Sequence, residues 1–152
     1  LEARMVQELA IKKTDKMLEI GSGSGYMTAL LATCGAFVHS IEINPELQGM
    51  AKRNLAANNI SNVQLEIGDG ARGWKSHAPY DVIVLTGSTP ILAAEFLQQL
   101  NAGGRLFAVV GDAPVMKGML YTAANGAHTE MELFETCIKP LTNAPQPERF
   151  KF

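Results

Sequence analysis

The sequence lacks any apolar run long enough to cross a membrane. Its longest unbroken apolar stretch extends from Leu106 to Val110, whereas a membrane-spanning helix needs about 20 residues. It also lacks an excess of either charge, because 13 basic side chains stand against 15 acidic ones and give a formal net charge of −2. Such a charge supplies no general field that attracts phosphates. The composition therefore predicts neither a membrane protein nor a nucleic-acid-binding protein.

Cysteine is scarce, and two residues as far apart as Cys34 and Cys137 indicate no disulfide framework. No signal-peptide pattern begins the sequence. Both features predict a reducing, cytoplasmic location. A length of 152 residues corresponds to about one domain. We expect a single domain over residues 1–152, with a monomer as the favoured state.

Strand and helix patterns alternate over the first two thirds of the chain. Strands are predicted at residues 16–20, 37–42, 63–67, 80–85 and 105–110. Helices are predicted before Thr14 and at residues 25–33, 44–58 and 90–100, with Gly103 and Gly104 breaking the last one. Such alternation with short connections indicates a parallel sheet with helices packed on it.

The last third of the chain changes character. Residues 116–123 and 130–138 flank Asn125-Gly126, a dipeptide typical of tight hairpins. Residues 140–152 contain three prolines and are predicted to form an extended tail. The predicted fold class is therefore α/β, with a mostly parallel sheet and an antiparallel C-terminal hairpin.

A glycine-rich loop follows the first predicted strand. It has the spacing G-x-G-x-G from Gly21 to Gly25, and it lies where open parallel sheets bind ligands. Glycines there permit a tight turn and let backbone N–H groups approach a ligand. The motif alone is weak evidence, because a close strand-to-helix turn needs the same residues.

Two carboxylates are predicted to stand at the same edge of the sheet. Glu42 ends the second strand, where an acid can accept hydrogen bonds from both ribose hydroxyls of a nucleoside. Asp69 directly follows the third strand and could accept from the exocyclic amine of an adenine. The alternatives are a solvated strand end for Glu42 and an Asp-Gly turn for Asp69.

Glu19 discriminates between nucleoside cofactors. A dinucleotide would place its pyrophosphate against the glycine loop, where a carboxylate two residues before Gly21 would oppose it. S-adenosylmethionine carries a sulfonium and an ammonium group instead, and it has no phosphates. Tyr26 also stands where the dinucleotide fingerprint requires its last glycine. We therefore predict S-adenosylmethionine as the cofactor.

No residue pattern for nucleophilic or metal catalysis is evident. The sequence shows no Ser/His/Asp or Cys/His arrangement, and His39, His77 and His128 have no metal-ligand spacing. Each histidine is expected to be structural or solvated, and no metal is predicted. The lack of such a pattern is consistent with a carboxylate as the group that is modified, because a carboxylate is ionised at neutral pH and needs no base to act as a nucleophile.

Several motifs occur in an order that is typical of one enzyme family. They are Met17–Tyr26, Ser40–Ile43, Gly68–Gly70, Gly73-Trp74, Ala78–Thr86, Gln98–Leu100, Gly103–Leu106 and Val110-Gly111. Over nearly its whole length the chain resembles the protein-L-isoaspartate O-methyltransferase family. Residues 133–136 and 140–150 are similar to a bacterial branch of that family.

The resemblance implies a Rossmann-like, S-adenosylmethionine-dependent methyltransferase fold. It also implies an activity in protein repair, the transfer of a methyl group to the free α-carboxylate of L-isoaspartyl residues in damaged proteins. By motif position, the cofactor would contact Glu19, Gly21, Ser22, Gly23, Gly25, Glu42, Ile43, Asp69, Gly70 and Thr86. Pro140, Leu141 and Thr142 match a family segment that approaches the substrate. No catalytic residue is assigned.

Members of the family carry a substantial segment before the helix that begins here at Leu1, and it includes a Gly-x-x-x-Ser motif. We therefore expect either an N-terminally truncated chain or a divergent core domain, and in both cases a fold that is kept and catalysis that is impaired. Two other functions stay open. One is a binding domain that retains the cofactor pocket without chemistry, and the other is a methyltransferase of the same fold that acts on another carboxylate or a small molecule.

Overall fold

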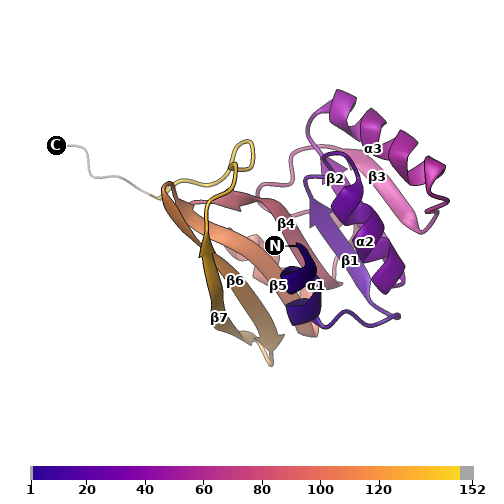
Figure 1. Cartoon of the computed structure of the whole chain (residues 1–152). Coiled ribbons are helices and arrows are strands. Elements are labelled where there is room, and N and C mark those ends of the chain that lie inside the picture. Colours follow the sequence, from indigo (N-terminus) through magenta and orange to yellow (C-terminus); the bar gives the residue numbers. More distant parts are fainter. Residues whose placement is uncertain (1, 148–152) are drawn as a thin grey trace.

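The computed structural model describes residues 2–147, and they form one mixed sheet covered by helices (Figure 1). The strands are β1 (Lys16–Ile20), β2 (Phe37–Glu42), β3 (Val63–Ile67), β4 (Tyr80–Thr89), β5 (Leu100–Asp112), β6 (Val115–Ala124) and β7 (Ala127–Thr136). The helices are α1 (Glu2–Leu9), α2 (Tyr26–Cys34), α3 (Pro45–Ala57), the 3₁₀ turn η1 (Lys75–His77) and α4 (Ala94–Gln98).

Within the described residues the strand order is β3-β2-β1-β4-β5-β6-β7. Strands β1 to β5 pair in parallel, whereas β6 pairs antiparallel with both β5 and β7. The predicted α/β class, with a mostly parallel sheet and an antiparallel C-terminal hairpin, is confirmed. No helix within residues 2–147 is long and apolar enough to span a membrane.

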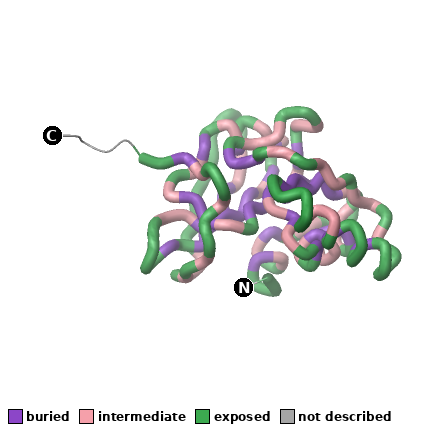
Figure 2. Tube along the Cα trace, turned by 90° about the horizontal axis from the view of Figure 1, so that it is seen from above, coloured by how far each residue is buried: buried purple, intermediate pink, exposed green. Residues whose placement is uncertain are grey.

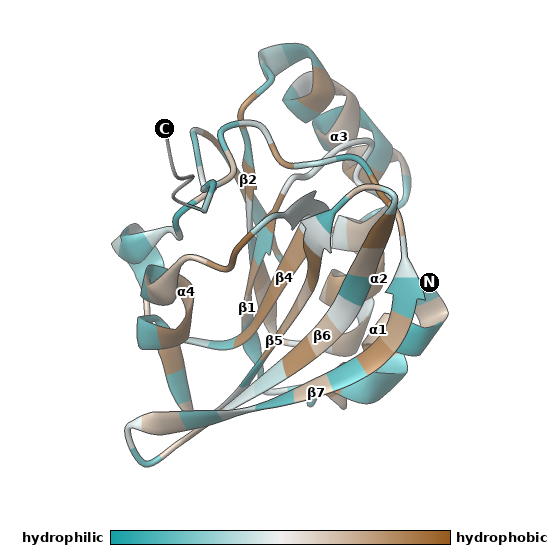
Figure 3. Cartoon of the chain, turned by 90° about the vertical axis from the view of Figure 1, so that its left-hand side faces the viewer, coloured by the Kyte–Doolittle hydropathy of each residue, from teal (hydrophilic) through white to brown (hydrophobic). Residues whose placement is uncertain are grey.

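The core consists of two side-chain layers, one on each face of the sheet, because successive strand residues point to opposite sides. On β1, Met17 joins the layer packed under α1 and α2, whereas Leu18 joins the opposite layer together with Phe96 of α4. Figure 3 shows α4 on one side of the sheet and α1 and α2 on the other. The buried segments gather in the middle of the molecule, as Figure 2 shows.

The predicted helix at residues 90–100 is largely wrong. The structure has only the short α4 there, and β5 already begins at Leu100. The strand predicted at residues 80–85 instead continues to Thr89, because Ser88 and Thr89 pair with Val109 and Val110 after a register shift, so tertiary pairing overrides the local pattern.

The predicted break at Gly103 and Gly104 is also wrong, since both glycines lie inside β5. Gly103 has a φ of +76° and lies beside a register shift between Tyr80 and Val82. An irregularity of this kind commonly needs a glycine in a left-handed conformation. β5 therefore runs through both glycines, whereas the sequence pattern placed the start of this strand at Arg105.

The C-terminal hairpin is confirmed. Asn125 and Gly126 have φ values of +49° and +78°, the left-handed pair that a tight hairpin turn requires. β7 begins at Ala127, three positions before the predicted strand. The first half of β7 is exposed and has no alternation of apolar residues, so the sequence pattern did not reveal it. Of the predicted tail, residues 148–152 lie outside the described residues, including Glu148, Arg149 and Phe150 of the family motif.

Arg105 of β5 ties the end of α1 to the sheet. Its guanidinium donates to the carbonyls of Leu9 at 2.8 Å and Ala10 at 3.2 Å, and it pairs with the Asp15 carboxylate at 2.6 Å. Only 15% of the Arg105 side chain and 7% of the Asp15 side chain are exposed, so this ion pair is poorly screened by solvent.

We expect Arg105→Ala to lower the free energy of unfolding by about 2–4 kcal/mol, because it leaves the buried Asp15 carboxylate without its partner. Urea unfolding measures the loss. Lys117→Ala is the control, since Lys117 and Glu132 form an exposed pair 3.3 Å apart worth less than about 1 kcal/mol. Equal losses in the two variants would contradict the anchoring role of Arg105.

Candidate functional site

A cavity of about 230 Å³ lies at the carboxyl ends of β1, β2, β3 and β4, where open parallel sheets bind ligands. Its wall brings together the glycine loop, two acids and the C-terminal segment. The predicted site residues that line it are Gly21, Gly23, Glu42, Ile43, Asp69, Gly70, Thr86, Pro140, Leu141 and Thr142.

The turn at Gly21 requires glycine for two reasons. Its φ is +97°, a region that residues with a Cβ avoid, and a Cβ built there would collide with the Thr86 hydroxyl. That hydroxyl donates to the carbonyls of Ile20 at 2.9 Å and Gly21 at 2.8 Å. The side chain of Thr86 therefore fixes the loop against β4 at the floor of the cavity.

Glu42 ends β2 beside the loop and is 6% exposed. Its Oε1 accepts from the Gly23 N–H at 2.9 Å, and its Oε2 accepts from the Asn44 N–H at 3.1 Å. A carboxylate has about four acceptor positions, so further hydrogen bonds from a ligand are possible on the cavity side.

Asp69 connects the strand edge to the C-terminal segment. Its Oδ1 accepts from the Ala71 N–H at 3.0 Å, and its Oδ2 accepts from the Asn143 side-chain amide at 3.0 Å. The same segment is held by Ser88, whose N–H donates to Lys139 at 3.0 Å and whose carbonyl accepts from Leu141 at 2.8 Å. Residues 139–142 thus form one wall of the cavity, and the adjoining Asn143, which the sequence did not single out, ties this wall to Asp69.

Glu19 is not among the residues that line the cavity. By strand alternation it shares the face of Met17, under α2, where its Oε1 accepts from the hydroxyls of Thr28 and Ser40. Its Oε2 is buried without a hydrogen-bond partner among the described residues. Burial raises the pKa of Glu19 to about 7. Glu19 therefore does not present a full negative charge to the cavity, so the predicted repulsion between Glu19 and a pyrophosphate is no longer supported.

Ser22 and Gly25 also lie outside the cavity wall. Ser22 is buried and its hydroxyl lies 2.6 Å from that of Ser40. Gly25 has a φ of +89°, and a Cβ there would lie 3.2 Å from the backbone of Ala51 in α3. These two residues build the loop, and direct contact with a cofactor stays a prediction for them, as it does for Glu19.

The sequence analysis missed much of the apolar wall. It comprises Ile20, Ile41, Leu47, Gly68, Ala71 and Gly87, and Lys139 lies beside them. Strand alternation could have found Ile20 and Ile41, because each is the residue at or next to the end of a strand on the face of Leu18. Among the described lining residues, Glu42 and Asp69 carry negative charge and Lys139 carries positive charge, so the acids exceed the bases.

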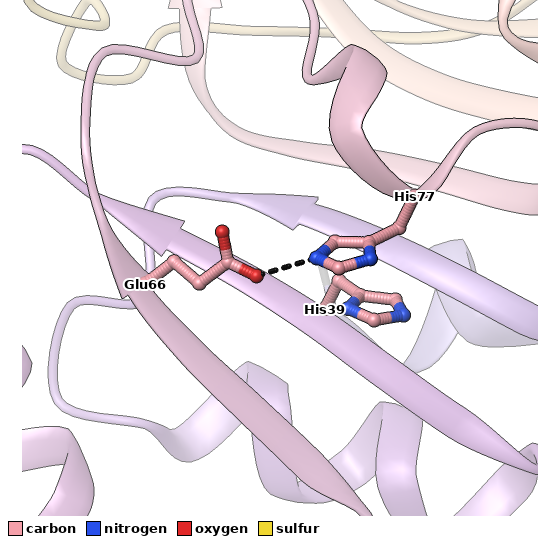
Figure 4. A group of neighbouring side chains, drawn as sticks. All are labelled: His39, Glu66 and His77. Carbon is pink, nitrogen blue, oxygen red and sulfur yellow. Dashed lines mark hydrogen bonds and ion pairs between the residues drawn. The ribbon is translucent and has the colours of Figure 1, made fainter.

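The histidines have no metal-ligand spacing in the sequence, but the fold brings two of them next to a carboxylate. His39, Glu66 and His77 lie together on the α4 side of the sheet, with ligand atoms within 4.8 Å of one another (Figure 4). Burial lowers the pKa of His39, and His77 and Lys16 lower it further. Sequence spacing could not reveal this group because β2, β3 and η1 each supply one member.

Comparison with known proteins decides the family. The model of the protein-L-isoaspartate(D-aspartate) O-methyltransferase family matches residues 1–144. The chain belongs to this family. A protein-L-isoaspartate O-methyltransferase of Methanoculleus marisnigri is 37% identical over 139 residues, which cover 91% of this chain and 63% of that relative. The chain therefore spans less than two thirds of the length of this relative.

Solved structures agree with the family assignment. One protein-L-isoaspartate O-methyltransferase superposes with a TM-score of 0.80 at 27% identity, covering 91% of this chain and 45% of that one. A Plasmodium falciparum protein described as an enzyme of the same kind, solved with S-adenosyl-L-homocysteine, has a TM-score of 0.78 at 19% identity and covers 93% of this chain and 71% of its own. The fold is therefore the Rossmann-like methyltransferase fold.

The buried Glu19 generates a pH prediction. Its pKa is about 7 in the folded protein, against an ordinary 4.5, so the folded state binds the proton more tightly than the unfolded chain. The stability from this proton is complete below pH 4.5 and is lost as the pH rises through 7. We expect the native protein to lose roughly 3 kcal/mol over this window relative to Glu19→Gln, which has no proton to release.

Urea unfolding of both proteins at a series of pH values measures this difference. Glu19→Gln keeps an oxygen that can accept from Thr28 and Ser40, so any constant offset from repacking separates from the pH-dependent part. A difference in stability that stays the same from acid to neutral pH would show that Glu19 is not a buried titrating acid.

Proposed function

We propose that the cavity binds S-adenosylmethionine and that the chain carries the methyl-transfer core of a protein-L-isoaspartate O-methyltransferase. The observation that carries the proposal is the cavity itself, in which the turn at Gly21 meets Glu42 and Asp69 at the carboxyl edge of the parallel strands. Membership of the family and the S-adenosyl-L-homocysteine bound to a protein of the same fold support it.

The residues of the cavity fit this cofactor. The carboxylate of Glu42 has acceptor positions left for the two ribose hydroxyls, and Gly23 has no atom within 4 Å of the place where a Cβ would stand. The excess of acid over base in the lining disfavours a diphosphate and favours a cationic group. Glu42 and Asp69, instead of Glu19, therefore supply the negative charge that favours a cationic cofactor.

The reaction requires position more than acid–base chemistry. Bound S-adenosylmethionine would supply an electrophilic methyl group on a sulfonium. An isoaspartyl α-carboxylate is already ionised at neutral pH, so the chain has to align it and exclude water. Proximity of this kind can contribute roughly 7–11 kcal/mol. We assign the alignment to residues 140–142, which line the cavity next to Thr86.

We further propose that residues 1–152 form a single methyltransferase domain of a cytoplasmic, monomeric protein of bacterial origin that acts on isoaspartyl proteins and on no nucleic acid. Cys34 and Cys137 are both free thiols, which supports a reducing compartment. The C-terminal motif noted above supports the bacterial origin.

Glu42→Ala should weaken S-adenosylmethionine binding by about 2–4 kcal/mol, because two hydrogen bonds from ribose hydroxyls to a carboxylate are lost. Isothermal titration calorimetry measures the change. Glu46→Ala is the matched control, since Glu46 is an exposed acid in the first turn of the adjoining α3. A loss below about 0.5 kcal/mol in Glu42→Ala would remove Glu42 from the site.

Methyl transfer to an isoaspartyl peptide, compared with the same peptide containing ordinary aspartate, tests the acceptor. We expect the cofactor to bind and the methyl group to reach the isoaspartyl peptide alone, more slowly in this chain than after the family's N-terminal segment is added. Binding without transfer even with that segment restored would favour a non-catalytic cofactor-binding domain, and transfer to both peptides would favour a broader carboxylate acceptor. A chain that fails to bind S-adenosylmethionine would refute the proposal.

A further inference from the structure

A second cluster of chemistry-bearing side chains lies away from the cavity wall. His39 of β2 and Glu66 of β3 are on the same face of the sheet, because Glu66 is opposite Ile41, two residues after His39. The turn η1 crosses this face and contributes His77. Figure 4 shows the two imidazoles one above the other with the carboxylate directed at His77.

The contacts within the cluster are close. The Nε2 atom of His77 lies 2.7 Å from Glu66 Oε1. The rings of His39 and His77 stack with centroids 4.1 Å apart and planes inclined by 12°. His39 is 7% exposed, and its Nδ1 is buried with no hydrogen-bond partner among the described residues. Buried polar atoms without a partner are rare, so this nitrogen points to a missing ligand.

We propose that His39, Glu66 and His77 form a site for a divalent transition-metal ion, with Zn²⁺ as the best fit. Two imidazole nitrogens and one carboxylate oxygen are the donor set of many zinc sites, with solvent in the fourth position. His77 and Glu66 provide the solvent access, since their side chains are 32% and 21% exposed.

The distances require a small rearrangement. Ligand atoms about 2.1 Å from a tetrahedral ion are about 3.4 Å from one another. The 2.7 Å contact between His77 and Glu66 has to open, and the longest separation, within 4.8 Å, has to close. The imidazoles have to rotate out of their stack for this, because the lone pairs of parallel rings do not converge on one point.

Neighbouring residues prepare the carboxylate and limit the affinity. Trp74 Nε1 donates to Glu66 Oε2 at 3.0 Å, which holds the carboxylate with Oε1 toward the histidines. Lys16 donates through Nζ to the His77 carbonyl, and its positive charge opposes a cation. The bound ion would connect β2 and β3 to the segment between Gly68 and Pro79. None of the three ligands lines the cavity, although Asp69 and Gly70 of the connected segment do, so the ion takes no part in the proposed methyl transfer itself.

Calorimetric titration of the full chain with Zn²⁺ tests the site. We expect binding of one ion in the micromolar range, weakened at least about tenfold by His77→Ala and by Glu66→Gln. His128→Ala is the matched control, because it removes an imidazole that also lies next to a carboxylate, Glu130 at 3.2 Å, in exposed β7. Its affinity should equal that of the native chain.

Lys16→Met should tighten Zn²⁺ binding, because the opposing charge is gone. Circular dichroism and the melting temperature without metal establish that each variant is folded, and Zn²⁺ should raise the melting temperature of the native chain more than that of His77→Ala at the same concentration. The absence of binding at 100 µM Zn²⁺, or equal affinity in His77→Ala and the native chain, would overturn the site.

Discussion

The turn that follows β1 is the constraint on which the cavity depends. Gly21 has a left-handed backbone, and the space where its Cβ would stand is taken by the hydroxyl of Thr86. Because β1 and β4 are parallel neighbours, their carboxyl ends meet, and Thr86 can reach the carbonyls of Ile20 and Gly21. The fixed turn then presents the Gly23 N–H to Glu42. Loop shape and acid position are thus parts of one hydrogen-bonded arrangement.

Two acids at the cavity wall, and not Glu19, supply the charge that favours a cationic cofactor. Glu19 lies beneath the loop, where burial favours its neutral form. Glu42 and Asp69 are at the cavity wall instead, where Glu42 accepts from the N–H groups of Gly23 and Asn44 and Asp69 accepts from that of Ala71. A phosphate-bearing ligand would meet these two acids, whereas a sulfonium or ammonium group would be attracted to them.

The sequence predicted what local patterns control. The residues of β2 and β3 match their predicted ranges, and the Asn125-Gly126 turn is where a two-residue hairpin loop was expected. The prediction failed where contacts between distant segments determine the structure. β4, for example, continues to Thr89 because β5 pairs with it. The histidine cluster was missed for the same reason, since its three members come together only through strand register and the placement of η1.

The cavity combines a rigid floor with a wall that is more weakly held. The floor consists of strand ends inside the sheet, and their movement would break the ladder between β1, β2 and β4. The wall of residues 139–142 is attached through backbone hydrogen bonds to Ser88, through the bond of the adjoining Asn143 to Asp69, each worth about 1 kcal/mol net, and through packing of the half-buried Leu141 on the core. Opening this wall therefore costs far less than unfolding the sheet. The side-chain amide of Asn143 donates to the Asp69 carboxylate. An adenine amine would bind the same carboxylate. Asp69 would therefore link the proposed cofactor site to the segment proposed to align the acceptor.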